Sequence, residues 1–392
     1  MEKIALLGST GSIGNSSIEV LLKHLDRFKL EVLTTNTNTS LLLKQCKDLQ
    51  PKYVFVKSKE ASLEFKSQLR ALSSKTVLLD TEQELMELIS SSEVNTVIAG
   101  MMGIAGLNLI YRSIEAGKKI LLANKEAYIV AGELLNELAA KNQATIFPLD
   151  SEHSAIHQCI LSKMNSSNNI KKLYLTGSGG PFLDKDITSF GLISPEEALA
   201  HPIWKMGKKI SVDSATMMNK GLELIEARWL FNINPEDIKI LIHPEGIIHS
   251  MVEYIDGSVI SQLSIPDMKI PIAYGLGYPI RIESGVKEID FHNLKPITFR
   301  DPDLTKFPSI NLARQAIDKG GTLPAILNAA NEEGVKSFLA KEIGFTQIME
   351  IVSSVINTIG SKPIDEIEDV FESDLTAREE ALKVIKSLNG NN

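Results

Sequence analysis

The chain has 392 residues, 43% of them hydrophobic and 23% charged, and a formal net charge of −8. This composition is typical of a globular protein, and the length exceeds what a single core usually supports, so we expect more than one domain. The negative balance makes nucleic acid and anionic membranes poor candidates as partners. An anionic small molecule would therefore have to be bound by a local cluster of donors.

The cysteines and the N-terminal residues narrow the class further. Cys46 and Cys159 are the only cysteines, too few for a disulfide framework or a zinc motif, and we expect both to be buried or inert thiols. Met1–Leu7 leads directly into a strand-like segment, with no leader pattern and no run of about 18 apolar residues. We therefore expect either a cytoplasmic protein or a mature chain from which a leader has been removed, in both cases without a membrane partner.

Residues 1–150 alternate strand-like and helical patterns. Ile4–Leu7 is a short apolar run of the kind found in a strand buried on both faces. A helical stripe follows at Ile18, Leu21, Leu22 and Leu25. Further strands are predicted at Leu30–Leu33, Tyr53–Val56, Thr96–Ala99, Lys119–Leu122 and Ala144–Pro148. The alternation predicts an α/β fold that begins with a Rossmann-like parallel sheet, covered by helices on both faces.

Residues 151–280 read as a second, α+β domain. A helix is predicted at Ser154–Leu161, followed by strands at Lys172–Thr176, Ile238–Ile242, Ile248–Tyr254 and Ser258–Leu263. Asp256-Gly257 between the last two strands is a hairpin signal, so we expect a mostly antiparallel sheet. This domain would carry the metal and substrate sites, as argued below.

The last third of the chain divides into a linker and a helical domain. Residues 281–307 hold several prolines with weak periodicity and are predicted to be a linker. Residues 308–392 are predicted to form a C-terminal helical domain, with one clear apolar stripe at Ala377, Ala381, Leu382, Ile385 and Leu388.

A glycine-rich segment, Gly8–Gly14, lies between the first predicted strand and the first helix. Its spacing is GxxGxxG rather than GxGxxG. The glycines still allow a tight turn, in which backbone N–H groups approach a pyrophosphate at a helix N-terminus. Because the segment follows a strand in an α/β domain, a dinucleotide site at residues 1–150 is favoured over a purely structural turn.

The second predicted strand indicates which dinucleotide is bound. An NAD site usually has Asp or Glu about 20 residues after the glycines, to accept the ribose hydroxyls. Here the strand ends in Thr34–Asn38, and Glu31 lies too early. No carboxylate would repel a 2′-phosphate, so NADP is favoured over NAD. The segment contains no Lys or Arg that would bind the phosphate directly.

Two carboxylates follow the last predicted strand of the first domain. The carboxyl ends of parallel strands face the ligand crevice, and on an extended segment Asp150 and Glu152 would point to the same side. Two converging carboxylates repel each other unless a cation lies between them. A solvated acidic loop is the alternative interpretation of these two residues alone.

Asn219, Lys220 and Glu223 are spaced to share one face of a helix. An amide, a cation and a carboxylate make a poor core face but a good ligand face, and Glu223 could add a third oxygen to a cation held by Asp150 and Glu152. Oxygen ligands suit Mg²⁺ or Mn²⁺ rather than Zn²⁺. A second glycine-rich turn, Thr176–Phe182, follows a strand, and its Ser178 could bind phosphate together with Ser214, Asn219 and Lys220.

Trp204 lies between Pro202 and Gly207 and is predicted to be on a loop. One hypothesis is that the loop is a lid whose indole covers the substrate and excludes water. The other is that the indole anchors the loop to the core.

The sequence resembles the 1-deoxy-D-xylulose 5-phosphate reductoisomerase family. The resemblance covers essentially the whole chain, and its most specific block is His201–Glu223. The other matching segments are Gly8–Gly14, Leu122–Glu126, Asp150–His153, Thr176–Phe182, Pro266–Met268 and Asn328–Glu332.

The resemblance implies an enzyme that uses NADPH and a divalent cation, Mg²⁺, Mn²⁺ or Co²⁺. It would isomerise and reduce 1-deoxy-D-xylulose 5-phosphate to 2-C-methyl-D-erythritol 4-phosphate, as a homodimer, in isoprenoid biosynthesis by the non-mevalonate pathway. The implied NADPH contacts are Thr10, Gly11, Ser12 and Ile13 at the phosphates, Asn36, Thr37 and Asn38 near the adenosine, and also Asn124, Glu126 and Gly207.

The resemblance also implies the metal and substrate residues. Asp150, Glu152 and Glu223 would hold the metal, and Lys125 and Ser151 would surround the reacting carbon skeleton. The substrate, mainly its phosphate, would be bound by Ser178, His201, Ser214, Asn219 and Lys220, with Trp204 on the closing flap.

The chain departs from the family pattern at two places. Many members have a basic residue where this chain has Thr37, and His243–Gly246 replaces a more usual Gln-Ser after the proline. His243 and His249 are interpreted as hydrogen-bonded sheet residues rather than ligands.

Two other functions are weighed against this one. An ordinary NADP-dependent aldehyde or semialdehyde dehydrogenase would need no metal and would normally use a nucleophilic Cys or a His–Lys pair; Cys159 lies outside such a pattern. A non-catalytic nucleotide sensor would leave the three carboxylates unexplained.

Overall fold

The computed structural model describes residues 1–72, 75–160, 169–204 and 206–390. Their contacts define two compact units, each assembled from segments that are separate in the sequence. The first contains Met1–Ala127, Leu135–Ser154 and Asp267–Lys287, and the second contains Tyr128–Leu134, Ala155–Pro266 and Glu288–Asn392. The units follow contacts rather than chain order, and the domain ranges derived from the sequence stay a prediction.

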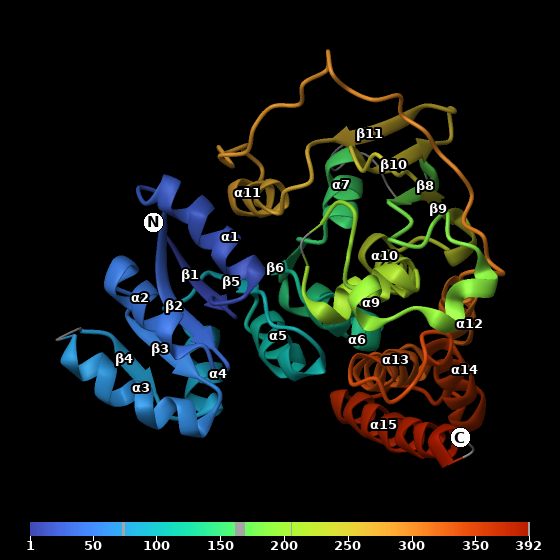
Figure 1. The fold of residues 1–392 in the computed structure, drawn as a ribbon. Helices are drawn as coiled ribbons and strands as arrows, with labels where there is room; N and C mark the ends of the chain where they lie inside the picture. The colour runs from blue at the N-terminus through green and yellow to red at the C-terminus, as the bar shows by residue number, and fades with distance from the viewer. Residues whose placement is uncertain (73–74, 161–168, 205, 391–392) are drawn as a thin grey trace. The chain divides into compact units, whose positions relative to one another are not determined.

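The first unit is built on a seven-stranded sheet in which every neighbouring pair is parallel (Figure 1). The predicted parallel sheet is confirmed. β4 is not predicted by the sequence, because its apolar run of Val77, Leu78 and Leu79 is only three residues long. The strand order is β4 (Val77–Leu79), β3 (Tyr53–Val56), β2 (Phe28–Thr35), β1 (Glu2–Leu7), β5 (Thr96–Ala99), β6 (Lys119–Leu122) and β7 (Thr145–Pro148).

Successive residues of β1 contribute to two different hydrophobic clusters. Ile4 and Leu6 belong to the cluster that includes helices α1, α2, α3 and α11, whereas Ala5 and Leu7 belong to the cluster with α4 and α5. Alternate side chains of a strand point to opposite faces, so both faces of the sheet are covered, as predicted. The helices are α1 (Ser12–Leu21), α2 (Thr39–Leu49), α3 (Lys59–Ala71), α4 (Glu82–Ser90), α5 (Leu107–Glu115), α6 (Lys125–Asn142) and α11 (Lys269–Gly277).

The second unit contains a four-stranded sheet. β10 is antiparallel to both its neighbours, whereas β8 and β9 are parallel, so the predicted, mostly antiparallel sheet is confirmed. The predicted hairpin turn is also present, with Gly257 at φ +86° and its N–H donating to the Tyr254 carbonyl at 3.0 Å. The strand order is β11 (Val259–Leu263), β10 (Ile248–Tyr254), β8 (Ile170–Gly177) and β9 (Ile238–Ile242).

The rest of the second unit outside its C-terminal region consists of an irregular segment and several helices. Residues 281–307 contain no helix or extended strand, apart from an isolated bridge between Arg300 and Ile242, as expected of a linker. The predicted helix at Ser154–Leu161 corresponds to α7, and Leu161 lies outside the described residues. The helices are α7 (Ser151–Cys159), α8 (Pro195–Ala198), α9 (Lys208–Ala215) and α10 (Met218–Phe231), with 3₁₀ segments η1 (Leu22–His24), η2 (Ile104–Gly106), η4 (Ile187–Leu192) and η5 (Pro235–Asp237).

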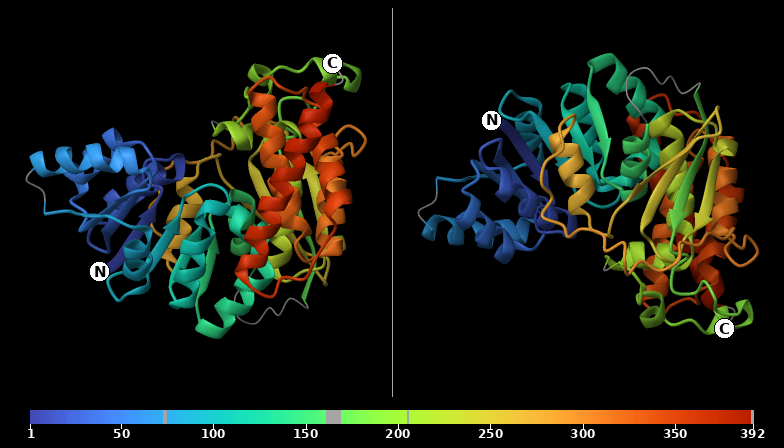
Figure 2. Two further views of the ribbon diagram at one scale, coloured as in Figure 1. Left: turned by 90° about the horizontal axis from the view of Figure 1, so that it is seen from below. Right: turned by 90° about the horizontal axis from the view of Figure 1, so that it is seen from above.

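The C-terminal region is helical, as predicted, and its helices lie side by side in the left view of Figure 2. α13 is buried along most of its length and contacts the other three helices. Aromatic rings continue this core, with Phe345 within 5.7 Å of Phe182, Phe190 and Phe338, measured between ring centroids. The helices are α12 (Ser309–Lys319), α13 (Leu323–Leu339), α14 (Gln347–Ile359) and α15 (Ile367–Gly390).

Three leucines assigned to buried stripes are exposed. Leu22 and Leu25 are 47% and 55% exposed because α1 begins earlier than its apolar stripe suggests and ends at Leu21. Leu382 is 42% exposed, although Ala377, Ala381 and Ile385 on the same predicted stripe of α15 are buried. Helical spacing therefore identifies the buried side of α15 but overestimates its width.

Both cysteine thiols are free and buried, as expected. Burial raises the pKa of Cys46 to about 12 and that of Cys159 to about 11, so both remain protonated and unreactive near neutral pH. Among the described residues, no helix combines the length and the apolar character needed to cross a bilayer.

Candidate active site

The glycine-rich turn after β1 places a helix N-terminus at the edge of the parallel sheet. Gly8 has φ +81°, and a Cβ there would lie 2.8 Å from the Gly100 carbonyl oxygen. A Cβ on Gly14 would lie 2.4 Å from the Gly8 carbonyl oxygen, so only glycine lets α1 pack this closely on the turn. The first turn of α1 carries no acidic residue. Its N–H groups and dipole are therefore suited to an anion beside Thr10, Gly11, Ser12 and Ile13.

The end of β2 lies next to this turn. Thr35 is the last residue of β2, and its hydroxyl is 2.7 Å from the Thr10 hydroxyl. The following residues, Asn36, Thr37 and Asn38, are exposed, and Asn38 caps α2 by accepting a hydrogen bond from Leu41 N–H at 3.3 Å. This segment offers polar groups but neither a carboxylate nor a cation.

Glu31, the carboxylate nearest to the end of β2, is not available to a ligand. It is 2% exposed and pairs with Lys29 at 2.6 Å within the same strand. The sequence prediction that it lies too early to bind a ribose agrees with this position.

Asn124 and Lys125 follow β6. The Asn124 side-chain oxygen Oδ1 accepts from Ala127 N–H at 3.3 Å and caps α6, while its Nδ2 donates to the Gly103 carbonyl at 3.0 Å. The Asn124 side chain is 1% exposed, and its two hydrogen bonds join the start of α6 to the Gly103 segment. Lys125 is 7% exposed and pairs with Asp150, and Glu126 is half-buried in the first turn of α6.

The acidic segment after β7 differs from the sequence prediction in one respect. Asp150 precedes α7, but Glu152 lies in the first turn of that helix rather than on an extended segment. The argument that alternation along a strand aligns the two carboxylates is therefore wrong. Ser151 Oγ donates to the Glu152 carboxylate at 2.5 Å, and both Asp150 and Glu152 are half-buried.

The second glycine-rich turn, after β8, packs against a lysine and against α9. A Cβ on Gly177 would lie 2.7 Å from Lys220 Cε, and Gly180, at φ +69°, would place a Cβ 2.6 Å from the Ser214 carbonyl oxygen. These approaches need glycine, and they place the half-buried Ser178 in the same turn. The predicted association of this turn with Ser214 and Lys220 is thus present in the second unit.

His201, on the loop between α8 and α9, is a neutral hydrogen-bond donor to this turn. Its Nδ1 accepts from the backbone N–H groups of Ile203 at 3.2 Å and Trp204 at 2.8 Å, which assigns the proton to Nε2. Nε2 then donates to Ser178 Oγ at 3.2 Å. Burial, aided by the charge of Lys220, lowers the pKa of His201 to about 4, so the ring is uncharged at neutral pH.

Asn219, Lys220 and Glu223 share one face of α10, as their spacing predicts. The Asn219 amide and the Lys220 ammonium each donate to the Glu223 carboxylate at 2.5 Å. The Glu223 side chain is fully buried and that of Lys220 is 7% exposed. The two charges of Lys220 and Glu223 balance each other, and removing either one would leave the other charge buried without its counter-charge.

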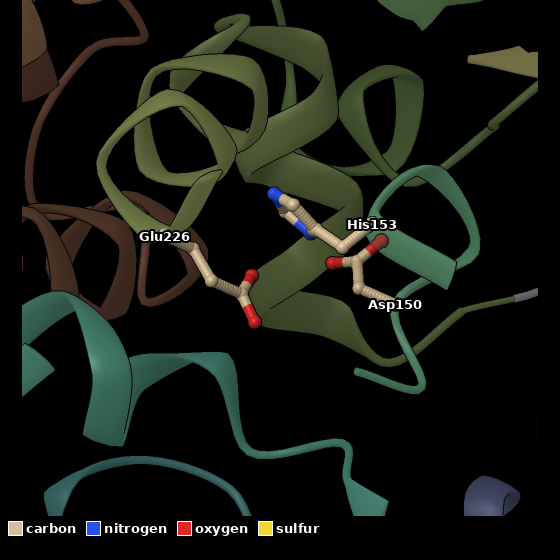
Figure 3. Close-up of side chains that lie close together, drawn as sticks. All are labelled: Asp150, His153 and Glu226. Atoms are coloured by element: carbon tan, nitrogen blue, oxygen red, sulfur yellow. The ribbon is translucent and has the colours of Figure 1, made fainter. Parts of the chain in front are cut away.

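Two groups of side chains offer possible metal ligands. In each, the ligand atoms lie within 4.8 Å of one another. One group is Asp150, Glu152 and Glu223. The other, shown in Figure 3, is Asp150, His153 and Glu226. The first group offers only oxygen, which suits Mg²⁺ or Mn²⁺. The second includes an imidazole, and His153 and Glu226 are both fully buried.

His153 and Glu226 were not identified from the sequence. Each is near a predicted ligand, His153 directly after Glu152 and Glu226 one helical turn after Glu223. Since residues three apart share a helix face, the position of Glu226 on α10 is a signal that could have indicated it.

Trp204 is half-buried on a loop between α8 and α9, and its ring centroid lies 6.3 Å from that of His249. Gly207, at the end of this loop, is exposed and precedes α9. His249 and His243 are hydrogen-bonded to the carbonyls of Ser264 and Thr298, as predicted for sheet residues.

The parallel sheet, with its glycine-rich turn at a helix N-terminus, defines the class of the protein as a dinucleotide-binding α/β protein. Comparisons with known proteins identify the family within this class. Residues 4–132 match the family model of 1-deoxy-D-xylulose 5-phosphate reductoisomerase, 146–231 match its C-terminal domain, and 263–380 match the DXP reductoisomerase C-terminal domain.

Known relatives match over almost the whole chain. The 1-deoxy-D-xylulose 5-phosphate reductoisomerase of Nitrosomonas eutropha is 46% identical, covering 97% of this chain and 93% of its own length. That of Saccharophagus degradans is 45% identical, covering 98% of both.

Solved structures agree with these relatives. A DOX-P reductoisomerase in complex with NADPH, fosmidomycin and magnesium has a TM-score of 0.93 at 40% identity, covering 99% of both chains. The Zymomonas mobilis reductoisomerase in complex with NADPH has a TM-score of 0.91 at 38% identity, covering 98% of this chain and 99% of its own. The chain therefore belongs to the 1-deoxy-D-xylulose 5-phosphate reductoisomerase family, which confirms the resemblance of its motifs.

Proposed function

We propose that this chain catalyses the NADPH-dependent isomerisation and reduction of 1-deoxy-D-xylulose 5-phosphate to 2-C-methyl-D-erythritol 4-phosphate, in isoprenoid biosynthesis. The observation that carries the proposal is the all-oxygen group of Asp150, Glu152 and Glu223, whose ligand atoms lie within 4.8 Å of one another. An ordinary dehydrogenase has no use for such a group, whereas rearrangement of a hydroxyketone needs its oxygens polarised.

The cofactor is NADPH, which supplies hydride to the substrate when bound. The turn at Gly8–Gly14 fits a pyrophosphate, because glycine keeps its backbone open and α1 begins at Ser12. Asn36, Thr37 and Asn38 border the adenosine ribose. The remaining contacts are assigned to Thr10, Gly11, Ser12, Ile13, Asn124, Glu126 and Gly207.

A divalent cation, Mg²⁺, Mn²⁺ or Co²⁺, binds to Asp150, Glu152 and Glu223. The carboxylate donors fit hard cations, and the partial exposure of Asp150 and Glu152 leaves room for substrate oxygens or water beside them. His153 and Glu226 are fully buried and are less suited to an ion that must also contact substrate. When bound, the cation supplies Lewis-acid polarisation of the substrate's carbonyl and hydroxyl oxygens.

Lys125 and Ser151 are assigned to the reacting carbon skeleton. Lys125 pairs with Asp150, and Ser151 donates to Glu152, so both orient a carboxylate while their donors remain next to it. Lys125 places a positive charge beside Asp150. It would stabilise negative charge on the substrate's oxygens during the rearrangement.

The substrate phosphate is bound by Ser178, His201, Ser214, Asn219 and Lys220. Backbone N–H groups of the glycine turn and the neutral Nε2–H of His201 supply donors without adding charge. Lys220 supplies the one full positive charge of this set, and Glu223 holds it in place through their ion pair. Contacts to the phosphate would hold the substrate in one orientation for the reaction.

The loop that carries Trp204 is proposed to close over bound substrate. The backbone N–H of Trp204 donates to His201, a residue of the phosphate set, and this bond ties the loop to that set, while the indole is half-buried. Closure would exclude water before hydride transfer.

One assay tests the function and separates it from the alternative dehydrogenase. The purified chain is expected to oxidise NADPH when 1-deoxy-D-xylulose 5-phosphate and Mg²⁺ or Mn²⁺ are added, and to stop in excess chelator. Oxidation that persists in chelator would favour the dehydrogenase, and binding of NADPH without any oxidation would favour a nucleotide sensor.

We also propose a homodimer and a cytoplasmic location. β11 is an edge strand of the second unit's sheet, and an edge with unpaired backbone groups is available for pairing with another chain. Light scattering at several protein concentrations tests the dimer. Cell fractionation tests the location.

A further inference from the structure

The end of β2 offers no cation for the 2′-phosphate that distinguishes NADPH from NADH. Asn36, Thr37 and Asn38 are uncharged, and the first turn of α2 contains no basic residue. A phosphate monoester binds most strongly to charged donors. NADP sites accordingly place a basic residue near the 2′-phosphate, and this contact favours NADPH over NADH. If the chain prefers NADPH, the cation must come from a neighbouring element.

The neighbouring strand supplies one. β3 pairs with β2 in parallel register, with Thr35 opposite Val56, so Lys57 directly follows the last paired residue. Lys57 N–H donates to the Thr35 carbonyl at 2.9 Å, and Ser58 N–H donates to the Asn36 carbonyl at 3.1 Å. These bonds hold Lys57 beside Asn36 at the spacing of adjacent strands, about 4.8 Å.

Lys57 is exposed, and no ion pair or side-chain hydrogen bond of Lys57 is found within the described part of the chain. By contrast, Lys52 at the other end of β3 pairs with Glu93 at 2.7 Å. The N-terminus of the 13-residue helix α3 follows immediately at Lys59. Glu60 in that first turn is the acidic residue nearest to Lys57 in the sequence, and its charge offsets part of the positive potential at the N-terminus of α3.

We propose that Lys57 is the residue that selects NADPH over NADH in this chain, by pairing its ammonium group with the 2′-phosphate. The inference rests on the proposed cofactor. It assigns to the end of β3 the charge that Thr37 does not provide. A single lysine contact to a phosphate is expected to contribute about tenfold or more in affinity.

The experiment compares two ligands that lack nicotinamide, 2′-phospho-ADP-ribose and ADP-ribose, by isothermal titration calorimetry. The natural chain is expected to bind the phosphorylated ligand about tenfold or more tightly, and more salt should reduce that ratio. In Lys57→Gln the ratio should fall about tenfold with the affinity for ADP-ribose unchanged. Lys57→Glu should lower it further.

Lys47→Gln is the matched control, because Lys47 is also an exposed lysine of this unit but lies in the last turn of α2. It should leave the ratio unchanged. Adding Thr37→Lys to Lys57→Gln should restore much of the preference, since it returns a charge to the end of β2.

A ratio in Lys57→Gln within about twofold of the natural chain, measured alongside the control, overturns the role of Lys57 while leaving the cofactor proposal standing. If the natural chain binds neither ligand, the proposed dinucleotide site itself is wrong and the inference falls with it.

Discussion

Two glycine-rich turns follow strands in this protein, one after β1 and one after β8, and they provide positive charge for an anion in different ways. The first turn packs glycines against backbone, with Gly8 beside Gly100 and Gly14 beside Gly8, and leads directly into α1. The second packs glycines against Lys220 and against the Ser214 carbonyl. One turn therefore presents a helix N-terminus, and the other lies on a buried ammonium group.

The difference matches the charges of the two proposed ligands. A pyrophosphate inside a dinucleotide can be bound by N–H groups and a helix dipole, since each phosphorus carries a single charge. A terminal phosphate monoester approaches two charges, which favours a full cation such as Lys220. Similar glycine patterns thus indicate a phosphate, but the source of positive charge decides which one.

Glu223→Gln is the substitution with the largest expected effect, because it changes a metal ligand and the ion-pair partner of Lys220 together. Turnover should fall by about 100-fold or more, and the Mn²⁺ concentration that gives half-maximal turnover should rise. NADPH affinity should stay unchanged. Mn²⁺ titration of kcat and NADPH fluorescence measure the two effects. Glu236→Gln, at an exposed position after α10, is the control. Unaltered Mn²⁺ dependence in Glu223→Gln would remove this residue from the metal site.

Lys220→Gln tests whether the second turn depends on charge. Loss of the ammonium group should lower kcat/KM for the sugar phosphate on the order of 10- to 100-fold without changing NADPH affinity. Steady-state kinetics and NADPH titration check this. Lys239→Gln, at an exposed position on β9, should behave like the natural chain. A matching loss of NADPH affinity in Lys220→Gln would contradict the separation of the two turns.

Gly8→Ala changes the first turn and Gly180→Ala changes the second, so the two variants test the turns separately. Both residues have positive φ and little room for a Cβ, so each substitution should cost about 1–2 kcal/mol or more of folding free energy. Gly8→Ala should raise the Kd for NADPH about tenfold, and Gly180→Ala should raise the KM for the sugar phosphate by a similar factor.

Gly257→Ala is the control for these two variants, because Gly257 has φ +86° but nothing within 4 Å of its Cβ position. It should lower stability without affecting either ligand. Equal weakening of both ligands by either active-site variant would show that the turns are not independent.

Trp204→Ala should raise the KM for the sugar phosphate several-fold, because the indole would no longer cover the closed site. Trp204→Phe should recover part of the loss. Normal kinetics together with a lower melting temperature would reduce Trp204 to an anchor of its loop.

His201→Gln is expected to have the smallest effect on stability, seen only in acid. The folded-state pKa of about 4 lies below the ordinary value of 6.5, so the unfolded chain binds the proton more readily. The natural chain should lose stability as the pH falls from 6.5 towards 4, and His201→Gln should lose less over this window. Urea unfolding at several pH values measures the difference. Parallel curves would contradict the neutral assignment of the ring.

The sequence predicted the elements that depend on local pattern. Apolar runs identified β3, β5 and β6, whose bounds agree with the prediction, and residue spacing placed Asn219, Lys220 and Glu223 on one face of α10. β4 was missed because its apolar run, Val77–Leu79, is only three residues long and is too short to identify a strand by pattern.

Other features depend on packing between distant segments. Residues 267–287 join the first unit, where α11 contacts α1 and shares its hydrophobic cluster, and nothing local in the sequence indicates this. Lys57 lies beside Asn36 only because of the register between β2 and β3. The sequence prediction for Glu152 assumes an extended segment, whereas Glu152 lies in the first turn of α7, and its role as a ligand stays a prediction.

The most direct test of the central claim is the proton NMR spectrum of the product formed from 1-deoxy-D-xylulose 5-phosphate, NADPH and Mg²⁺. Rearrangement before reduction attaches the methyl group to a carbon without hydrogen, so the account predicts a methyl singlet. Simple reduction of the ketone would attach it to a carbon bearing one hydrogen. A methyl doublet, or an unchanged substrate spectrum, would contradict the account.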